Sequence, residues 1–156
     1  MIFGGFLEHF DDQVYGGIYD PGLTLSDTNG FRLEALRELR IPIVRWPGGC
    51  FVGGYRWEPG VGKNCTPIDD MAWGVIELNT FDTDEYVELC RVMGWEPFTC
   101  NNAGNGPIEE MRKWVEYCNS TIHRKLSITL TTLIASLPST RDLRSRKARA
   151  KCRPIH

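Results

Sequence analysis

The sequence predicts an α/β protein in which strands of a parallel sheet alternate with covering helices. Three parts of the 156-residue chain, at 2–39, 41–93 and 96–118, each begin with a short apolar run and end with a helical pattern. Turn-forming or capping residues lie between the two members of each pair. Three strand-then-helix units in a row are typical of a parallel sheet with helices packed on it.

The first unit begins with a buried strand at 2–7, which brings Glu8 and His9 to its end. A polar loop at 11–28, interrupted by Gly and Pro, follows without any period. Asn29 is the expected cap of the next helix, because its side chain can accept a backbone hydrogen bond. The apolar positions of that helix recur at helical spacing, and they are Phe31, Ala35, Leu36 and Leu39.

The second unit has its strand at 41–46, and Pro42 ends the preceding helix. Residues 47–81 then show no helical pattern, and a connection of that length in a compact domain is usually functional. Asp82 or Thr83 is expected to cap the following helix, and Gly94 to end it. The predicted buried face of this helix consists of Tyr86, Val87, Cys90 and Met93.

The third unit has its strand at 96–100 and a turn-rich loop at 101–106. Pro107 is expected at the first helical position, where its missing N–H costs nothing. The helix after it is expected to bury an apolar stripe, namely Ile108, Met111, Val115 and Cys118.

The charge changes sharply along the chain. Residues 1–119 carry nine Lys and Arg against nineteen Asp and Glu, a net charge of −10, whereas residues 120–156 carry nine Lys and Arg against Asp142 alone, a net charge of +8. We therefore predict a domain at 1–119 and an unrelated basic tail at 120–156. A frame change or a retained intron would explain this tail, and a genuine extension that is mostly disordered is the alternative.

No secretory signal or membrane-spanning run is visible in the sequence, which favours a cytoplasmic protein. The six cysteines form no CxxC pair and no His cluster accompanies them, so no metal site or redox motif is indicated. Free thiols are the expected state in a reducing compartment. A bridge between Cys50 and Cys65 is the alternative that the spacing leaves open.

Three motifs carry a resemblance to a known family. They are Arg45–Cys50 (RWPGGC), Phe6–Phe10 (FLEHF) and Met71–Gly74 (MAWG). In this order and at these spacings they resemble the intracellular α-L-arabinofuranosidases of glycoside hydrolase family 51, over about residues 1–119. The resemblance implies the first three βα units of a (β/α)8 barrel, a fold that typically needs about 250 residues.

The same resemblance implies four substrate-binding residues. Glu8 matches a glutamate that accepts hydrogen bonds from sugar hydroxyls, and Cys50 matches a cysteine that lines the same subsite. Trp73 matches a tryptophan that faces the sugar, and Asn102 matches the floor of the site. Three of them have an ordinary structural alternative: Glu8 as a surface glutamate, Cys50 as a small buried hydrophobe and Trp73 as a loop residue folded on the core.

Arg45 is expected to support this site. Side chains alternate along a strand, so Ile43 and Arg45 share one face while Val44 and Trp46 share the other. An arginine that points inward near the end of a strand needs a partner. Glu8, at the corresponding end of the neighbouring strand, is the nearest candidate by topology. The sequence therefore predicts an ion pair between Arg45 and Glu8.

The chain contains no candidate for the catalytic groups. In the resembled family both catalytic carboxylates lie on later strands, the fourth and the seventh, which this chain lacks. We therefore expect a fragment of an exo-acting retaining enzyme, inactive by itself, that recognises terminal arabinofuranosyl units of arabinan or arabinoxylan saccharides. The resemblance implies no cofactor, and full-length members are commonly homo-oligomers.

Two other functions remain open from the sequence. A non-catalytic or vestigial carbohydrate-binding protein would use the same residues. A nucleic-acid-binding protein would use the basic tail, and its affinity would depend steeply on salt. The tail has no aromatic residue to stack on bases and the rest of the chain is acidic, so we expect no nucleic-acid partner.

Overall fold

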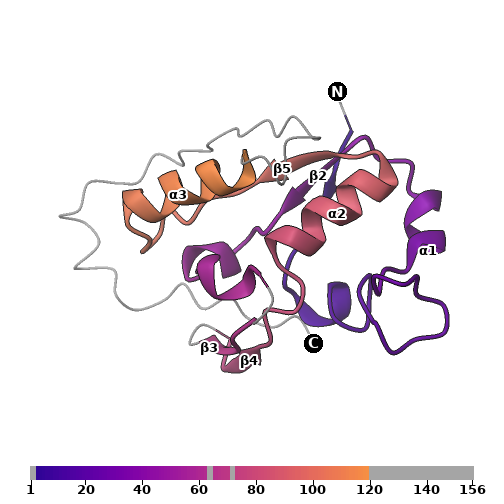
Figure 1. Cartoon of the computed structure of the whole chain (residues 1–156), viewed down its shortest axis with the longest axis horizontal. Helices are drawn as coiled ribbons and strands as arrows, with labels where there is room; N and C mark the ends of the chain where they lie inside the picture. Colours follow the sequence, from indigo (N-terminus) through magenta and orange to yellow (C-terminus); the bar gives the residue numbers. More distant parts are fainter. Residues whose placement is uncertain (1–2, 63–64, 71–72, 120–156) are drawn as a thin grey trace.

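The structure, a computed structural model, describes residues 3–62, 65–70 and 73–119. The predicted tail at 120–156 lies outside the described residues, as do Met71 and Ala72. In chain order the elements are β1 (Gly5–Phe6), η1 (Asp11–Gln13), α1 (Leu33–Glu38), β2 (Ile43–Trp46), η2 (Phe51–Gly53), η3 (Glu58–Gly60), β3 (Ile68–Asp70), β4 (Val75–Glu77), α2 (Thr83–Met93), β5 (Glu96–Thr99) and α3 (Ile108–Cys118), where η marks a 3₁₀ helix (Figure 1).

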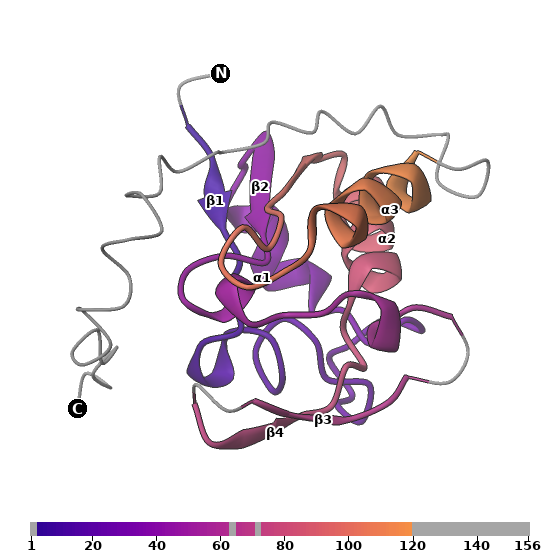
Figure 2. The ribbon, with the colours of Figure 1, turned by 90° about the vertical axis from the view of Figure 1, so that its left-hand side faces the viewer.

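The three predicted strands form one parallel sheet in the order β1–β2–β5. In its register Phe6 lies opposite Arg45, and Arg45 lies opposite Phe98. Figure 2 shows β1 and β2 side by side. This confirms the α/β class. The strands are shorter than predicted, and β1 is reduced to two residues that pair with β2 alone.

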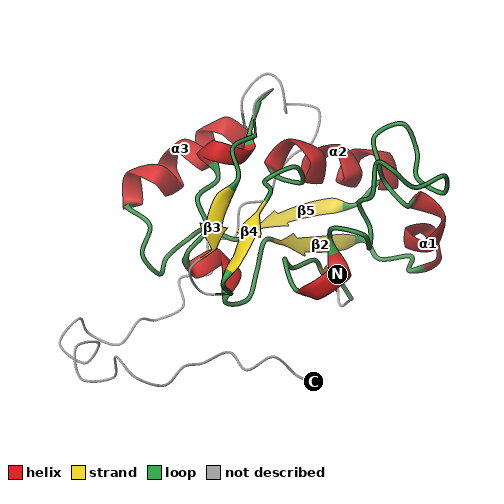
Figure 3. Ribbon diagram, turned by 90° about the horizontal axis from the view of Figure 1, so that it is seen from below, coloured by secondary structure: helices red, strands yellow, loops and turns green. Residues whose placement is uncertain are grey.

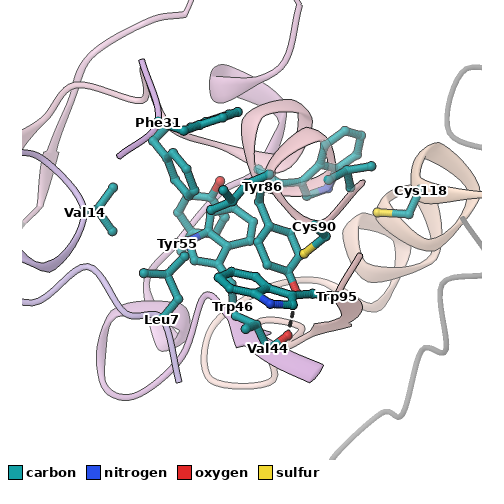
Figure 4. Packing of buried hydrophobic residues seen from close by; sticks show 14 of the residues in the cluster. Leu7, Val14, Phe31, Val44, Trp46, Tyr55, Tyr86, Cys90, Trp95 and Cys118 are labelled. Carbon is teal, nitrogen blue, oxygen red and sulfur yellow. Dashed lines mark hydrogen bonds between the residues drawn. The ribbon is translucent and has the colours of Figure 1, made fainter. Parts of the chain in front are cut away.

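One face of the sheet is packed against helices. Val44 and Trp46 point to this face and are buried, and Figure 3 shows α2 and α3 on the same side of β2 and β5. Trp46 stacks on Tyr86 of α2, with ring centroids 5.0 Å apart. Such ring pairs contribute about 1 kcal/mol beyond their burial. The Tyr86 hydroxyl donates to the Val44 carbonyl at 2.6 Å, so it joins α2 directly to β2 (Figure 4).

Helix α2 follows its prediction closely. Asp82 is the N-cap and forms a capping box with Glu85, which satisfies two backbone N–H groups at the helix start. Gly94 ends the helix in the left-handed conformation, at φ 70°. Tyr86, Val87 and Cys90 are buried as expected.

The prediction for α1 was wrong in two respects. Asn29 is not its cap, because the Asp27 carboxylate takes the backbone N–H groups of Asn29 and Phe31 in a turn, and the helix begins only at Leu33. Leu36 is buried, but Ala35 and Leu39 are exposed. Residues four apart share one side of a helix, and in this short helix the side of Ala35 and Leu39 faces solvent.

The prediction for α3 also needs correction. Pro107 is its N-cap, one position before the expected one, and Ile108 is 81% exposed. Trp114, which the predicted stripe omitted, is buried together with Cys118. The Trp114 indole donates to the Thr83 hydroxyl at 3.0 Å, so the helix turns this residue inward and Ile108 outward.

The long connection at 47–81 is not structureless. It contains η2 and η3, followed by an antiparallel hairpin of β3 and β4 in which Ile68 lies opposite Glu77. Figure 3 shows this hairpin at the ends to which the arrows of β2 and β5 point. Within the described part of the chain, no helix has the length and apolar character that crossing a membrane requires.

Candidate functional site

Glu8 and Arg45 form an ion pair at the carboxyl end of the sheet. The Glu8 carboxylate meets Arg45 Nη2, and both side chains are partly shielded from solvent. The pairing of β1 with β2 brings them together, because the Leu7 N–H donates to the Arg45 carbonyl at 2.8 Å. The guanidinium also lies 4.5 Å from the centroid of the Phe6 ring. The predicted ion pair is confirmed.

The two glycines of the RWPGGC motif make room for this pair. Gly49 has φ +61°, and a Cβ there would lie 2.6 Å from Glu8 Oε2. A Cβ at Gly48 would overlap the Arg45 guanidinium. A side chain at either position would therefore have to displace the Arg45 or the Glu8 side chain, and at Gly49 the positive φ disfavours one as well. The Glu8 and Arg45 side chains occupy the space next to these two glycines.

Cys50 follows β2 and is exposed. It lines a cavity of about 430 Å³ together with Phe51, Tyr55 and Asp70. Cys65, Cys90, Cys100 and Cys118 are free thiols, as expected. Cys65 is free, so the alternative bridge between Cys50 and Cys65 does not form.

Trp73 lies between the two strands of the hairpin and lines a second cavity, of about 400 Å³. Its ring meets that of Phe10 edge to face, with centroids 6.0 Å apart. The backbone N–H of Trp73 donates to the Asp70 carboxylate at 3.2 Å. Its indole Nε1 is buried and has no hydrogen-bond partner among the described residues. An indole N–H can donate one hydrogen bond, and this one is unpaired within the described residues.

Asn102 follows β5 and is buried, at 4% exposure. Its Oδ1 accepts from the backbone N–H groups of Gly104, Asn105 and Gly106 at 3.0 to 3.2 Å. Its Nδ2 donates to the Tyr55 carbonyl at 2.9 Å. These bonds hold the loop after β5, so a structural role accounts for the polar atoms of Asn102. A contact between Asn102 and a substrate stays a prediction.

The structure brings the predicted residues to one edge of the sheet. Glu8, Cys50 and Asn102 follow the carboxyl ends of β1, β2 and β5, which run parallel. The hairpin that carries Trp73 lies at the same edge (Figure 3). The carboxyl ends of parallel strands are where ligands bind in this class of fold.

Sequence reasoning missed a polar network beside this edge. His9 Nδ1 lies 3.0 Å from Glu77 Oε2, and the Trp46 indole donates to His9 Nε2 at 3.1 Å. The Tyr15 hydroxyl and the Asn79 N–H both donate to Glu77 Oε1. The position of His9, next to Glu8 in the FLEHF motif, was the available signal. Nothing in the local sequence distinguishes Glu77 from a surface glutamate.

The surroundings of Glu77 determine its protonation. Burial alone would raise the pKa of this carboxyl, but the hydrogen bonds from His9 and Tyr15 outweigh it and hold the pKa below its ordinary value. The pKa of the Tyr15 hydroxyl is raised by burial and by the neighbouring Glu77. Tyr15 is therefore a permanent donor and Glu77 a permanent acceptor at neutral pH.

Asp82, the N-cap of α2, is a second buried carboxyl. It accepts from the Thr83 N–H, at 2.5 Å, and from the Tyr55 hydroxyl. Burial raises the pKa of Asp82 to about 7, although both hydrogen bonds act in the opposite direction. No group of three or more His, Cys, Asp or Glu in the described ranges is arranged to hold a metal ion.

The groups at this edge have the chemistry that suits a neutral polar ligand. The Glu8 carboxylate can accept from hydroxyls, the Trp73 indole can donate, and aromatic rings line the adjacent cavity. The fold and this edge define an α/β protein with a carboxylate- and aromatic-lined site at the carboxyl ends of its parallel strands.

Comparisons with known proteins identify the family. The family model of the α-L-arabinofuranosidase 1 domain matches residues 35–128, past the predicted boundary at Asn119. The chain thus belongs to this α-L-arabinofuranosidase family, as the sequence resemblance predicted.

Individual relatives agree with this assignment. The probable α-L-arabinofuranosidase C of Aspergillus niger is 53% identical over 125 residues, which cover 77% of this chain and 25% of that protein. The intracellular exo-α-L-arabinofuranosidase of Bacteroides ovatus is 40% identical over 126 residues, 76% of this chain and 24% of that protein. The solved structure of the thermostable GH51 α-L-arabinofuranosidase from Thermotoga petrophila superposes with a TM-score of 0.72 at 40% identity, and the match covers 84% of this chain and 30% of that one. The chain spans about a quarter of the length of the curated relatives that it matches.

Proposed function

We propose that this chain is part of an exo-acting, retaining α-L-arabinofuranosidase, which removes terminal arabinofuranosyl units from arabinan- or arabinoxylan-type saccharides. The observation that carries the proposal is the Glu8–Arg45 ion pair at the carboxyl edge of the parallel sheet, in a chain of this family. In this proposal β1, β2 and β5 are the first three strands of a (β/α)8 barrel, whose active site gathers at that edge.

Glu8, Cys50, Trp73 and Asn102 would form part of the wall that holds the arabinofuranosyl ring. Arg45 orients the Glu8 carboxylate, so that it accepts hydrogen bonds from the hydroxyls of the sugar. The catalytic acid/base and nucleophile lie on strands outside this chain. A cytoplasmic location is supported by the relative named as intracellular, and a homo-oligomeric whole protein is part of the same proposal.

Two measurements on the full 156-residue chain test this proposal. The first is release of 4-nitrophenol from its α-L-arabinofuranoside, for which we expect no turnover above buffer, since loss of even one catalytic group typically costs several orders of magnitude in rate. Turnover that disappears on substitution of a carboxylate of this chain would contradict the assignment of both catalytic groups to other strands.

The second measurement is binding of methyl α-L-arabinofuranoside, followed by NMR chemical-shift changes. We expect saturable binding that Glu8→Gln weakens and that Glu116→Gln, an exposed control on α3, leaves unchanged. Binding without hydrolysis by this chain is also what a non-catalytic carbohydrate-binding protein would give. Equal binding by the Glu8→Gln and Glu116→Gln variants would show that Glu8 does not contact the sugar.

A further inference from the structure

Among the described residues of the hairpin that carries Trp73, no apolar side chain is fully buried. In β4, Val75 is 57% exposed and Ile76 is 65% exposed, whereas Glu77 is only 6% exposed. In β3, Ile68 and Asp70 are half-buried and Asp69 is exposed. A hairpin normally docks through a hydrophobic face. The buried side chain that β4 contributes is instead a carboxylate.

Glu77 joins the hairpin to the segment that follows β1. Its Oε2 faces His9 Nδ1, and its Oε1 accepts from the Tyr15 hydroxyl and from the Asn79 N–H. His9 and Tyr15 are more than sixty residues away from Glu77 in sequence. The carboxylate is thus satisfied by three donors, two of which belong to a different part of the fold.

Trp46 determines which nitrogen of His9 carries the proton. The Trp46 indole N–H can only donate, and it points at His9 Nε2, 3.1 Å away. His9 Nε2 must therefore accept, which leaves the proton on Nδ1, directed at Glu77. The imidazole also stacks on Phe51, with ring centroids 4.2 Å apart and planes 6° from parallel. The ring is fixed in both orientation and tautomer.

We propose that His9 and Glu77 are positioning residues, which lock the β3–β4 hairpin, and with it Trp73, onto the carboxyl edge of the sheet. The residues on either side of His9 contact both parts of the proposed site. His9 lies between Glu8, which is paired with Arg45, and Phe10, whose ring meets Trp73. The bond between His9 and Glu77, together with that from Tyr15, thus sets the position of Trp73 relative to Glu8. The consequence for sugar binding rests on the proposed function, but the anchoring of the hairpin does not.

The first test is the His9 tautomer in the unliganded full chain, measured from the imidazole ¹⁵N chemical shifts. We expect the Nδ1–H form at neutral pH, and Trp46→Phe should release this preference. A wild-type His9 in the Nε2–H form would overturn the proposal, whatever the variants do.

The second test uses Glu77→Gln. The introduced amide NH₂ meets either the His9 Nδ1–H or the Asn79 N–H, so in both orientations a donor faces a donor. We expect the hairpin to loosen and Trp73 to become more accessible to acrylamide. Fluorescence quenching reports this change because the other four tryptophans of the chain, Trp46, Trp57, Trp95 and Trp114, are all buried. Glu116→Gln is the matched control, and far-UV circular dichroism verifies that each variant is folded.

Combining the two variants separates positioning from general destabilisation. With Trp46→Phe, His9 can carry its proton on Nε2 and accept from the amide at position 77 through Nδ1. Glu77→Gln should therefore increase quenching less in the Trp46→Phe background than in the wild type. An equal or larger increase in that background, or no increase in the wild type, would refute the positioning role.

Measuring glycoside binding by the same variants distinguishes this inference from the proposed function. If both hold, Glu77→Gln weakens binding of methyl α-L-arabinofuranoside about tenfold, equivalent to about 1.4 kcal/mol, while Glu8 is untouched. If the wild-type chain does not bind the glycoside but Glu77→Gln still exposes Trp73, the proposed function fails and the anchor stands. If the wild type binds and Glu77→Gln neither exposes Trp73 nor weakens binding, the anchor fails alone.

Discussion

Gly49 packs directly against the carboxylate of Glu8. The backbone of Gly49 adopts φ +61°, and a Cβ at this position would lie 2.6 Å from Glu8 Oε2, well inside van der Waals contact. The loop after β2 thus closes over the carboxylate that the end of β1 presents. The positive φ favours glycine here, and any larger residue would also have to displace the Glu8 carboxylate.

Gly49→Ala tests this relationship. We expect a loss of about 1–3 kcal/mol in the free energy of unfolding, because alanine is strained at positive φ and its methyl group displaces Glu8. Urea denaturation measures the change. Gly54→Ala is the control, since Gly54 has φ −113° and its nearest contact is Phe51 O at 4.0 Å. Equal stability of the two variants would contradict the packing described here.

The Glu8–Arg45 pair should behave as one unit. Arg45→Met leaves a partly buried carboxylate without its partner, and Glu8→Gln leaves the arginine without its own. We expect each single change to cost about 1–3 kcal/mol and the double change to cost less than their sum. A double-mutant cycle of urea denaturation measures the coupling, and additive losses would show that the pair contributes no interaction of its own.

The hydroxyl of Tyr86 should contribute more to the stability of the fold than the hydroxyl of an exposed tyrosine. It donates to the Val44 carbonyl and accepts from the Phe98 N–H at 2.9 Å, so it connects α2 with two strands. Tyr86→Phe removes both of these buried hydrogen bonds, and we expect a loss of about 1–3 kcal/mol. Tyr19→Phe, at a half-buried ring, is the control for thermal denaturation. Equal melting temperatures for the two variants would argue against this connection.

Asp82 should make stability depend on pH. Burial raises its pKa from 3.8 to about 7, so between these values the folded chain holds a proton that the unfolded chain has released. The contribution of Asp82 to stability is therefore present below about pH 4 and falls as the pH rises to about 7. The fall amounts to a few kcal/mol, since one pKa unit corresponds to about 1.4 kcal/mol.

Asp82→Asn removes this titration. We expect the free energy of unfolding of the variant, measured by urea denaturation from pH 4 to 8, to lack the fall that the wild type shows. Asp69→Asn, at an exposed position, should follow the wild type. A wild type whose stability rises over this range with no contribution from Asp82 would disprove the assignment.

The sequence by itself determined the features that depend on neighbouring residues. The alternation of strands and helices follows from apolar periodicity, and the caps of α2 follow from Asp82, Glu85 and Gly94, all within or next to that helix. The Glu8–Arg45 pair was also predictable, because two adjacent parallel strands bring their carboxyl ends to one edge.

Only the tertiary structure decided which side chains meet across long separations in the chain. Glu77 reads as a surface glutamate until the hairpin folds back on His9, 68 residues earlier. Ile108 and Leu39 satisfy a helical period yet remain exposed, because Trp114 and Leu36 take the inward positions. Periodicity fixes the spacing of apolar residues along a helix, but the packing partner selects the face that is buried.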